Sequence, residues 1–253
     1  MNPTLLLFFS FTLGLIVGSF LNVITLRLPK DESIGGRSHC TNCGHTLTAK
    51  DLVPALSFLF LGGKCRYCKK KINRRYLLFE LTTGLLFALV FSLSQPVNFF
   101  DYALLLRNLI GVSVLLVTFV TDFEHYLIFD KVIFSGLGGV TLFNIFLDII
   151  HHPSVWYRGF FVSGLIGAAT FGGLLYVMWR ASQGRWLGFG DVKYMLLIGS
   201  LLGSLGSVVG FFLSFIIGAI VAIPLLILDK AGLKSKLPLG CFFSISAFLT
   251  LFW

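Results

Sequence analysis

DVKYMLLIGSLLGSLGSVVGFFLSFIIGAIVAIPLLILD occupies residues 191–229, and no Asp, Glu, Lys or Arg lies between Lys193 and Asp229. An apolar run of about 20 residues can cross the roughly 30 Å hydrocarbon layer of a bilayer as a helix. This stretch has room for two such helices, and the boundary that we predict between them lies at Gly203 to Gly206. Segments of this kind indicate a membrane protein.

The composition of the whole chain supports helical membrane spans. Of its 253 residues, 56% are hydrophobic and 12% are charged, whereas soluble domains have roughly a quarter charged residues. Only helices or a closed barrel can cross a bilayer, because backbone amides find no water there, and these runs are too long for barrel strands. We predict an all-α polytopic membrane protein with about eight transmembrane helices. They cover residues 4–27, 77–95, 102–121, 127–150, 158–180, 191–205, 207–229 and 237–253.

The basic residues predict the orientation. No basic residue precedes the first apolar core and no small-residue cleavage site follows it, so we expect an anchor and not a cleaved signal peptide. Arg27 and Lys30 follow this span, so the positive-inside rule places the N-terminus outside the cytoplasm. Of the 20 Lys and Arg residues, only Arg107 and Arg158 then fall at outer ends. The net charge of +9 thus reflects topology and attraction to anionic membrane lipid, and we predict no nucleic-acid partner.

The segment at residues 28–76 has a soluble composition and contains two C-x-x-C pairs. Cys40 and Cys43 form CTNC, Cys65 and Cys68 form CRYC, and 21 residues separate the pairs. This pattern is typical of a structural zinc site with four thiolate ligands, which stabilises a segment too small to bury a core. Disulfides are disfavoured on the reducing cytoplasmic side, and four free thiols remain an alternative. The neighbouring histidines are spare candidate ligands: His39 and His45.

Two aspartates are expected at the cytoplasmic ends of membrane helices. Asp122, in FVTDFEHYLIFD, follows the third span, and Asp191, in LGFGDVKYM, begins the sixth. Ionisable groups at such positions are costly and suggest a function. Two carboxylates at close range do not easily ionise together, so one can hold a proton while the other activates water, as in an aspartic peptidase. Gly188 and Gly190 suit such a site, because residues without Cβ let a substrate strand approach closely.

The residues alone leave other functions open for these aspartates. Asp191 can cap its helix or pair with Lys193, and Asp122 can belong to a solvated loop with Glu124 and Asp130. A transporter could use Asp122 and Asp191 as proton or cation relay groups, although both lie near one surface and not at the midplane. A scaffold protein would depend on neither carboxylate. These observations do not decide between an enzyme and a transporter.

Several linked motifs resemble one family over essentially the full chain. In order they are GSFLNVITLRLP at residues 18–29, the C-x-x-C pairs with DLVPALSF between them, INRRYLLFEL, DFEHYLIFD and GFGDVK. The chain is similar in these motifs to bacterial type IV prepilin peptidases. It departs from the family pattern in having CTNC for C-P-x-C, RYLL for R-Y-P, and Phe129, Leu239 and Cys241 at positions that are often Pro, Phe and Pro. Cys241, in the last span, is expected to be a packing residue.

The resemblance implies a GxGD-type aspartic peptidase of the bacterial cytoplasmic membrane, with Asp122 and Asp191 as its catalytic pair. It implies prepilins or pseudopilins of type IV pilus and type II secretion systems as substrates, whose short basic leader is cut on the cytoplasmic side. It also implies N-methylation of the new N-terminus with S-adenosylmethionine, an activity associated with the cysteine-bearing loop, to which we assign no residue. The acidic side chains within reach of the leader are Asp31, Glu32, Asp51, Glu80, Glu124 and Asp130.

Three parts are predicted along the chain. Residues 1–27 form the first transmembrane helix, residues 28–76 form the cytoplasmic zinc domain, and residues 77–253 form the transmembrane peptidase domain.

Overall fold

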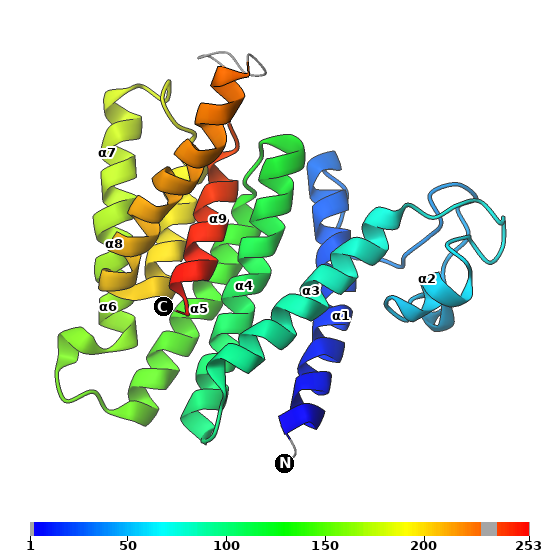
Figure 1. The fold of residues 1–253 in the computed structure, drawn as a ribbon, viewed down its shortest axis with the longest axis horizontal. Helices are drawn as coiled ribbons and strands as arrows, with labels where there is room; N and C mark the ends of the chain where they lie inside the picture. The colour runs from blue at the N-terminus through cyan, green and yellow to red at the C-terminus, as the bar shows by residue number, and fades with distance from the viewer. Residues whose placement is uncertain (1–2, 229–236, 253) are drawn as a thin grey trace. The chain divides into compact units, whose positions relative to one another are not determined.

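The computed structural model describes residues 3–228 and 237–252, which form helices and loops. Figure 1 shows the course of the chain. Among the described residues, six helices are long and apolar enough to cross a membrane: Thr4–Lys30, Arg74–Ser94, Phe99–His125, Asp130–His151, Phe160–Ala181 and Phe189–Ile227. The prediction of an all-α polytopic membrane protein is therefore confirmed. Three lysines that the predicted topology places on the cytoplasmic side lie outside the described residues: Lys230, Lys234 and Lys236.

The predicted number of eight spans differs from these six long helices for two reasons. Most of the two spans expected at 191–205 and 207–229 lies in α8 (Phe189–Ile227), a 39-residue stretch in which two helices meet at a kink at Gly203. The span expected at 237–253 corresponds to α9 (Leu239–Thr250), which has 12 residues and is shorter than a full membrane-crossing helix.

The chain divides into two compact units, Met1–Gln95 and Pro96–Trp253. In the first unit, α1 (Pro3–Arg27) packs along α3 (Arg74–Ser94) through small residues. A Cβ at Gly14 would lie 2.8 Å from the Thr83 carbonyl oxygen, and one at Gly18 would lie 2.8 Å from the Thr83 Cβ. Because glycines let membrane helices approach this closely, α3 belongs to the first unit. The domain boundary expected at residue 77 therefore does not coincide with the division between the units.

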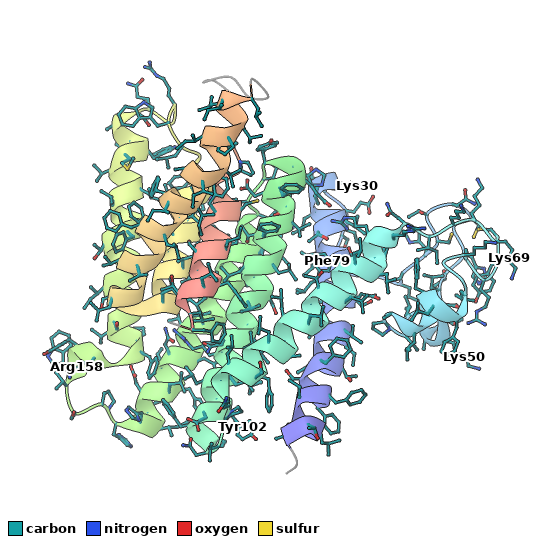
Figure 2. The ribbon with its side chains drawn as sticks, viewed as in Figure 1. Lys30, Lys50, Lys69, Phe79, Tyr102 and Arg158 are labelled. Carbon is teal, nitrogen blue, oxygen red and sulfur yellow. The ribbon has the colours of Figure 1, made fainter. Side chains whose placement is uncertain are left out.

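The segment between α1 and α3 contains the cysteine pairs and has little regular structure. It includes the short helices η1 (Leu28–Lys30), η2 (Ala49–Asp51) and α2 (Leu56–Phe60). The Ala55 amide donates to Glu80 Oε2 of α3 at 2.8 Å, which attaches α2 to the first unit. Figure 2 shows Lys50 and Lys69 on this segment.

The second unit is a helical bundle that contains both predicted catalytic aspartates. Its elements in chain order are α4 (Phe99–His125), α5 (Asp130–His151), η3 (Trp156–Arg158), α6 (Phe160–Gly167), the π-helical turn η4 (Ala168–Gly172), α7 (Gly173–Ala181), α8 and α9. Its buried core takes side chains from most of these helices, including Leu115 of α4, Val140 of α5, Leu175 of α7, Leu197 of α8 and Phe243 of α9.

Gly203 interrupts α8 with a left-handed φ of 73°, at the boundary predicted between two spans. Tyr194 Oη lies 2.7 Å from Ser244 Oγ, and a Cβ at Gly218 would lie 3.3 Å from the Phe242 ring. In a straight helix, with its rise of about 1.5 Å per residue, positions 194 and 218 would be about 36 Å apart. Because both halves of α8 contact the same part of α9, the chain reverses direction at Gly203 (Figure 1).

Side chains from neighbouring helices satisfy the backbone carbonyls that the break in α8 exposes. Arg107 of α4 is 5% exposed and donates to the carbonyls of Ser200, at 3.4 Å, and Leu201. Asn144 of α5 accepts from Arg107 Nε at 2.6 Å and donates to the Ser200 carbonyl at 2.8 Å. A membrane offers these carbonyls no water, so a non-helical break requires such partners. Arg107 thus fixes the end of the half-helix that begins near Asp191.

Replacing Arg107 by Met should lower the thermal stability of the protein in detergent micelles. The change removes the Arg107 donors to the Leu201 carbonyl and to Asn144, and one of the two donors to the Ser200 carbonyl, so we expect a loss of roughly 2–4 kcal/mol. The matched control is Arg158→Met, because Arg158 is exposed in the loop between α5 and α6 (Figure 2). Equal unfolding midpoints for the two variants would contradict this role of Arg107.

Candidate active site and metal site

Asp122 lies in the last turn of α4, where the first turn of α9 holds its carboxylate. Asp122 is 6% exposed, and its Oδ2 accepts the Cys241 amide at 3.1 Å. A Cβ at Gly240 would lie 2.9 Å from Asp122 Oδ2, so only glycine fits there without displacing the carboxylate. The interpretation of Asp122 as part of a solvated loop is therefore wrong.

Asp191 lies in the first turn of α8 and is half-buried. Its Oδ2 accepts the amide of Gly188, the residue that precedes the helix, at 3.1 Å. Asp191 thus caps its own helix, which was one of the alternatives from the sequence. It does not pair with Lys193, whose ammonium contacts both carboxylate oxygens of Asp130 at 2.7 Å.

The helix ends that hold the two aspartates meet around one side chain. Ile128 follows α4, and a Cβ at Gly190 of α8 would lie 3.0 Å from the Ile128 Cβ. A Cβ at Gly240 of α9 would lie 3.3 Å from Ile128 Cδ1. These contacts bring together the helix ends that carry the two aspartates, which are 69 residues apart in sequence.

The two glycines of the GFGD motif differ in their surroundings. At Gly190 an added Cβ would lie 3.0 Å from the Ile128 Cβ, so a larger residue there would require Ile128 to shift. At Gly188 an added Cβ would lie 3.4 Å from Asp191 Oδ2, which is an ordinary contact distance. Neither glycine has a positive φ. The role of Gly188 in the structure is its amide, which donates to Asp191.

Several acidic side chains proposed as leader contacts already have partners. Asp51 forms an ion pair with Arg66 at 2.6 Å, and this guanidinium holds the pKa of Asp51 well below its usual range. Glu80 accepts the Ala55 amide, Asp130 pairs with Lys193, and Glu124 lies 3.8 Å from the His125 imidazole. Asp31 and Glu32 are exposed in the loop after α1.

The four cysteines of the first unit come together as the sequence predicts. The Sγ atoms of Cys40, Cys43, Cys65 and Cys68 all lie within 4.8 Å of one another, and those of Cys40 and Cys68 are 3.9 Å apart. Zn–S bonds of about 2.3 Å in a tetrahedron require sulfur separations of about 3.8 Å. The four thiols therefore fit a zinc ion, with every ligand supplied by the protein.

Each C-x-x-C pair forms the same backbone turn. The Cys40 amide donates to the His45 carbonyl at 2.9 Å, and the Cys65 amide donates to the Lys70 carbonyl at 2.8 Å. The fourth residue after each first cysteine is left-handed, with φ of 69° at Gly44 and 59° at Lys69. These turns direct backbone amides at the sulfurs, as the knuckles of zinc sites do.

The thiols interact with these amides and with one another. Hydrogen bonds from the backbone amides of Cys43 and Asn42 lower the pKa of Cys40, and the Lys70 amide lowers the pKa of Cys68 to about 6. The His45 amide favours the Cys43 thiolate, but desolvation and the neighbouring sulfurs raise the pKa of Cys43 to about 11. Four sulfurs this close need a cation if all of them are to ionise together.

Gly240 and Cys241 were missed as site residues in the sequence. Cys241 was expected to be a packing residue, and its side chain is indeed 4% exposed, with its thiol 3.2 Å from the Phe119 carbonyl. Its backbone amide, however, contacts Asp122. The signal was the departure from the family pattern in the sequence PLGC, where this chain has Cys241 at a position that is often proline. A proline there could not donate a backbone N–H.

Two family models match the chain, one on each side of the division between the units. The bacterial peptidase A24 N-terminal domain matches residues 12–93, and the type IV leader peptidase family matches residues 109–223. No solved structure is similar enough to this chain to count as a match.

Three relatives that share one description match both units of the chain. A protein of Bacillus subtilis is 33% identical over 90% of this chain and 86% of its own length. One of Aeromonas hydrophila is 30% identical over 98% of this chain and 91% of its own. One of Myxococcus xanthus is 36% identical over 77% of this chain, but the matched region spans only 55% of that relative. Each of these relatives is described as a prepilin leader peptidase/N-methyltransferase.

Proposed function

The chain belongs to the type IV leader peptidase family and is thus an enzyme, a membrane peptidase, and from this premise we propose that it removes the leader peptides of prepilins or pseudopilins. Asp122 and Asp191 are its catalytic residues. The observation that supports this assignment most directly is the meeting of the ends of α4 and α8, with each carboxylate held by a backbone amide.

The proposed cleavage uses one protonated and one ionised aspartate. Two neighbouring carboxylates share a proton more easily than they ionise together. The ionised member takes a proton from water, which then attacks the scissile carbonyl of the prepilin. The protonated member supplies a proton to the amine that leaves. Gly188 and Gly190 shape the cleft in which the extended substrate approaches Asp191.

We propose that the cut takes place at the cytoplasmic face of the bacterial inner membrane. The N-terminus then lies outside, and the cysteine segment and both aspartates lie inside, as the Lys and Arg distribution predicts. The substrate would enter with its hydrophobic helix in the bilayer and its basic leader in the cytoplasm. Asp31 and Glu32 are exposed acidic candidates for the leader.

A second activity and two bound groups complete the proposal. Cys40, Cys43, Cys65 and Cys68 hold a structural zinc, which stabilises the segment between α1 and α3. S-adenosylmethionine supplies the methyl group for the new N-terminal amine, since the relatives are named N-methyltransferases as well as peptidases. We assign the methyl donor to the first unit, without naming residues.

Reconstituted wild-type protein should convert a prepilin into a mature pilin in lipid vesicles. Mass spectrometry should show the loss of the leader, and addition of S-adenosylmethionine should add about 14 Da to the new N-terminus. A mock reconstitution without the enzyme provides the control. Proton flux in these vesicles without any peptide cleavage would instead support the transporter alternative.

A further inference from the structure

The two aspartates are held in the same way by different helices. Asp191 Oδ2 accepts the Gly188 amide, at the start of its own helix α8. Asp122 Oδ2 accepts the Cys241 amide at the start of α9, a helix 119 residues later in the chain. The first N–H groups of a helix have no partner within the helix and favour a negative charge nearby. Asp122 thus depends on α9 for a contact that Asp191 obtains locally.

The first turn of α9 packs tightly against the Asp122 carboxylate. A Cβ at Gly240 would lie 2.9 Å from Asp122 Oδ2 and 3.2 Å from its Cγ. A shift of this turn toward α4 would collide with the carboxylate, and a shift away would break its hydrogen bond to Cys241. The location of the first turn of α9 therefore sets the location of the Asp122 oxygens.

A chain of buried hydroxyl groups anchors this first turn of α9. Ser244 Oγ donates to the Gly240 carbonyl at 2.7 Å, which leaves Tyr194 Oη, also 2.7 Å away, as the donor to Ser244 Oγ. Tyr194 is fully buried. These two hydroxyls thus link α8 to the carbonyl of Gly240 at the start of α9.

These hydroxyls lie close to the site along their own helices. Tyr194 lies about one turn after Asp191 on α8, and Ser244 lies one turn after Gly240 on α9. The Tyr194–Ser244 hydrogen bond therefore ties the start of α8 to the start of α9. In a buried pair each hydroxyl needs its partner, so the two helices are held in one register.

We propose that the first turn of α9 is a third component of the catalytic site, in which Gly240 and the Cys241 amide position Asp122 and the Tyr194–Ser244 pair holds that turn in place. The inference rests on the proposed function of Asp122. Gly240, Tyr194 and Ser244 are positioning residues, since they act through Asp122. The alternative is that Asp122 merely caps α9, in which case these contacts would affect folding and not turnover.

Gly240→Ala should lower the kcat for prepilin cleavage by about tenfold or more, because small displacements of a catalytic group cost large factors in rate. KM should stay unchanged, since the change does not touch the leader. The matched control is Gly138→Ala, where an added Cβ meets nothing within 4 Å. The proposal would be overturned if Gly240→Ala had the wild-type kcat. It would also be overturned if its kcat fell by no more than the fraction of the variant protein that is unfolded.

A second set of variants tests the hydroxyl chain if Gly240→Ala does not fold. Tyr194→Phe and Ser244→Ala should each lower kcat several-fold, and the double variant should be no slower than the slower single variant, because both break one chain. A fall in unfolding midpoint with unchanged kcat would assign these residues a structural role only. Asp122→Asn, measured in the same assay, distinguishes the proposed function from this inference. Cleavage of prepilin by Asp122→Asn refutes the proposed function itself. Loss of cleavage in Asp122→Asn together with a wild-type kcat in Gly240→Ala refutes only this inference.

Discussion

Asp122→Asn and Asp191→Asn should each reduce prepilin cleavage by at least about 1,000-fold, because an amide can neither accept the proton of water nor supply one to the leaving amine. Asparagine keeps the shape of aspartate and can still accept the Cys241 or Gly188 amide through its oxygen. The folded structure should therefore survive. Initial rates with purified enzyme and prepilin in vesicles provide the measurement.

The matched control for these variants is Asp101→Asn. Asp101 lies in the first turn of α4, where it accepts the Val97 and Asn98 amides at 3.0 and 3.1 Å, far along the helix from Asp122. Its variant should cleave at the wild-type rate. Normal cleavage by Asp122→Asn or Asp191→Asn would show that the pair does not perform the chemistry, whatever the family assignment.

Cys43→Ser should abolish zinc binding and unfold the segment between α1 and α3. Wild-type protein should contain about one zinc per chain, since the four sulfurs are close enough for tetrahedral coordination. This segment has only short helices around its cysteines, so metal binding supplies much of its folding free energy. Metal analysis of the purified protein measures the first effect, and limited proteolysis between residues 28 and 73 measures the second.

Cys241→Ser serves as the control for the zinc experiment, because Cys241 lies in the second unit and outside the cysteine cluster. This variant should retain zinc and the protease resistance of the wild type. Wild-type protein that is free of zinc after careful handling would return the four cysteines to the free-thiol alternative. The peptidase proposal would stand, since no cleavage step uses the metal.

Most membrane helices could be predicted from the sequence because the bilayer imposes a length and a composition on each span. The span predicted at 102–121 lies within α4 (Phe99–His125). The span predicted at 127–150 matches α5 (Asp130–His151) to within a few residues. In α8 the predicted boundary between two spans, at Gly203 to Gly206, contains the break that the structure shows at Gly203. Hydropathy does not report whether a glycine such as Gly203 bends a helix, reverses it or stays helical, because that depends on the partners of the freed carbonyls.

The cluster of four cysteines could also be predicted from local pattern. Each C-x-x-C pair closes its own turn through hydrogen bonds between residues five apart, from Cys40 to His45 and from Cys65 to Lys70. A ligand set made from two such local turns leaves a clear signal in sequence spacing. The catalytic candidates were found for a different reason: each aspartate is an expensive charge at the end of an apolar run.

The sequence by itself determined the class of protein, most of the spans, the cluster of four cysteines and the two aspartates at helix ends, because each of these follows from local composition or spacing. Only the tertiary structure decided which partners the aspartates have. The contact between Asp122 and the Cys241 amide joins residues 119 apart, and the Arg107 contacts with Ser200 and Leu201 join residues more than 90 apart. Such contacts depend on how helices pack and on where a break such as Gly203 returns the chain, and no local pattern encodes that packing.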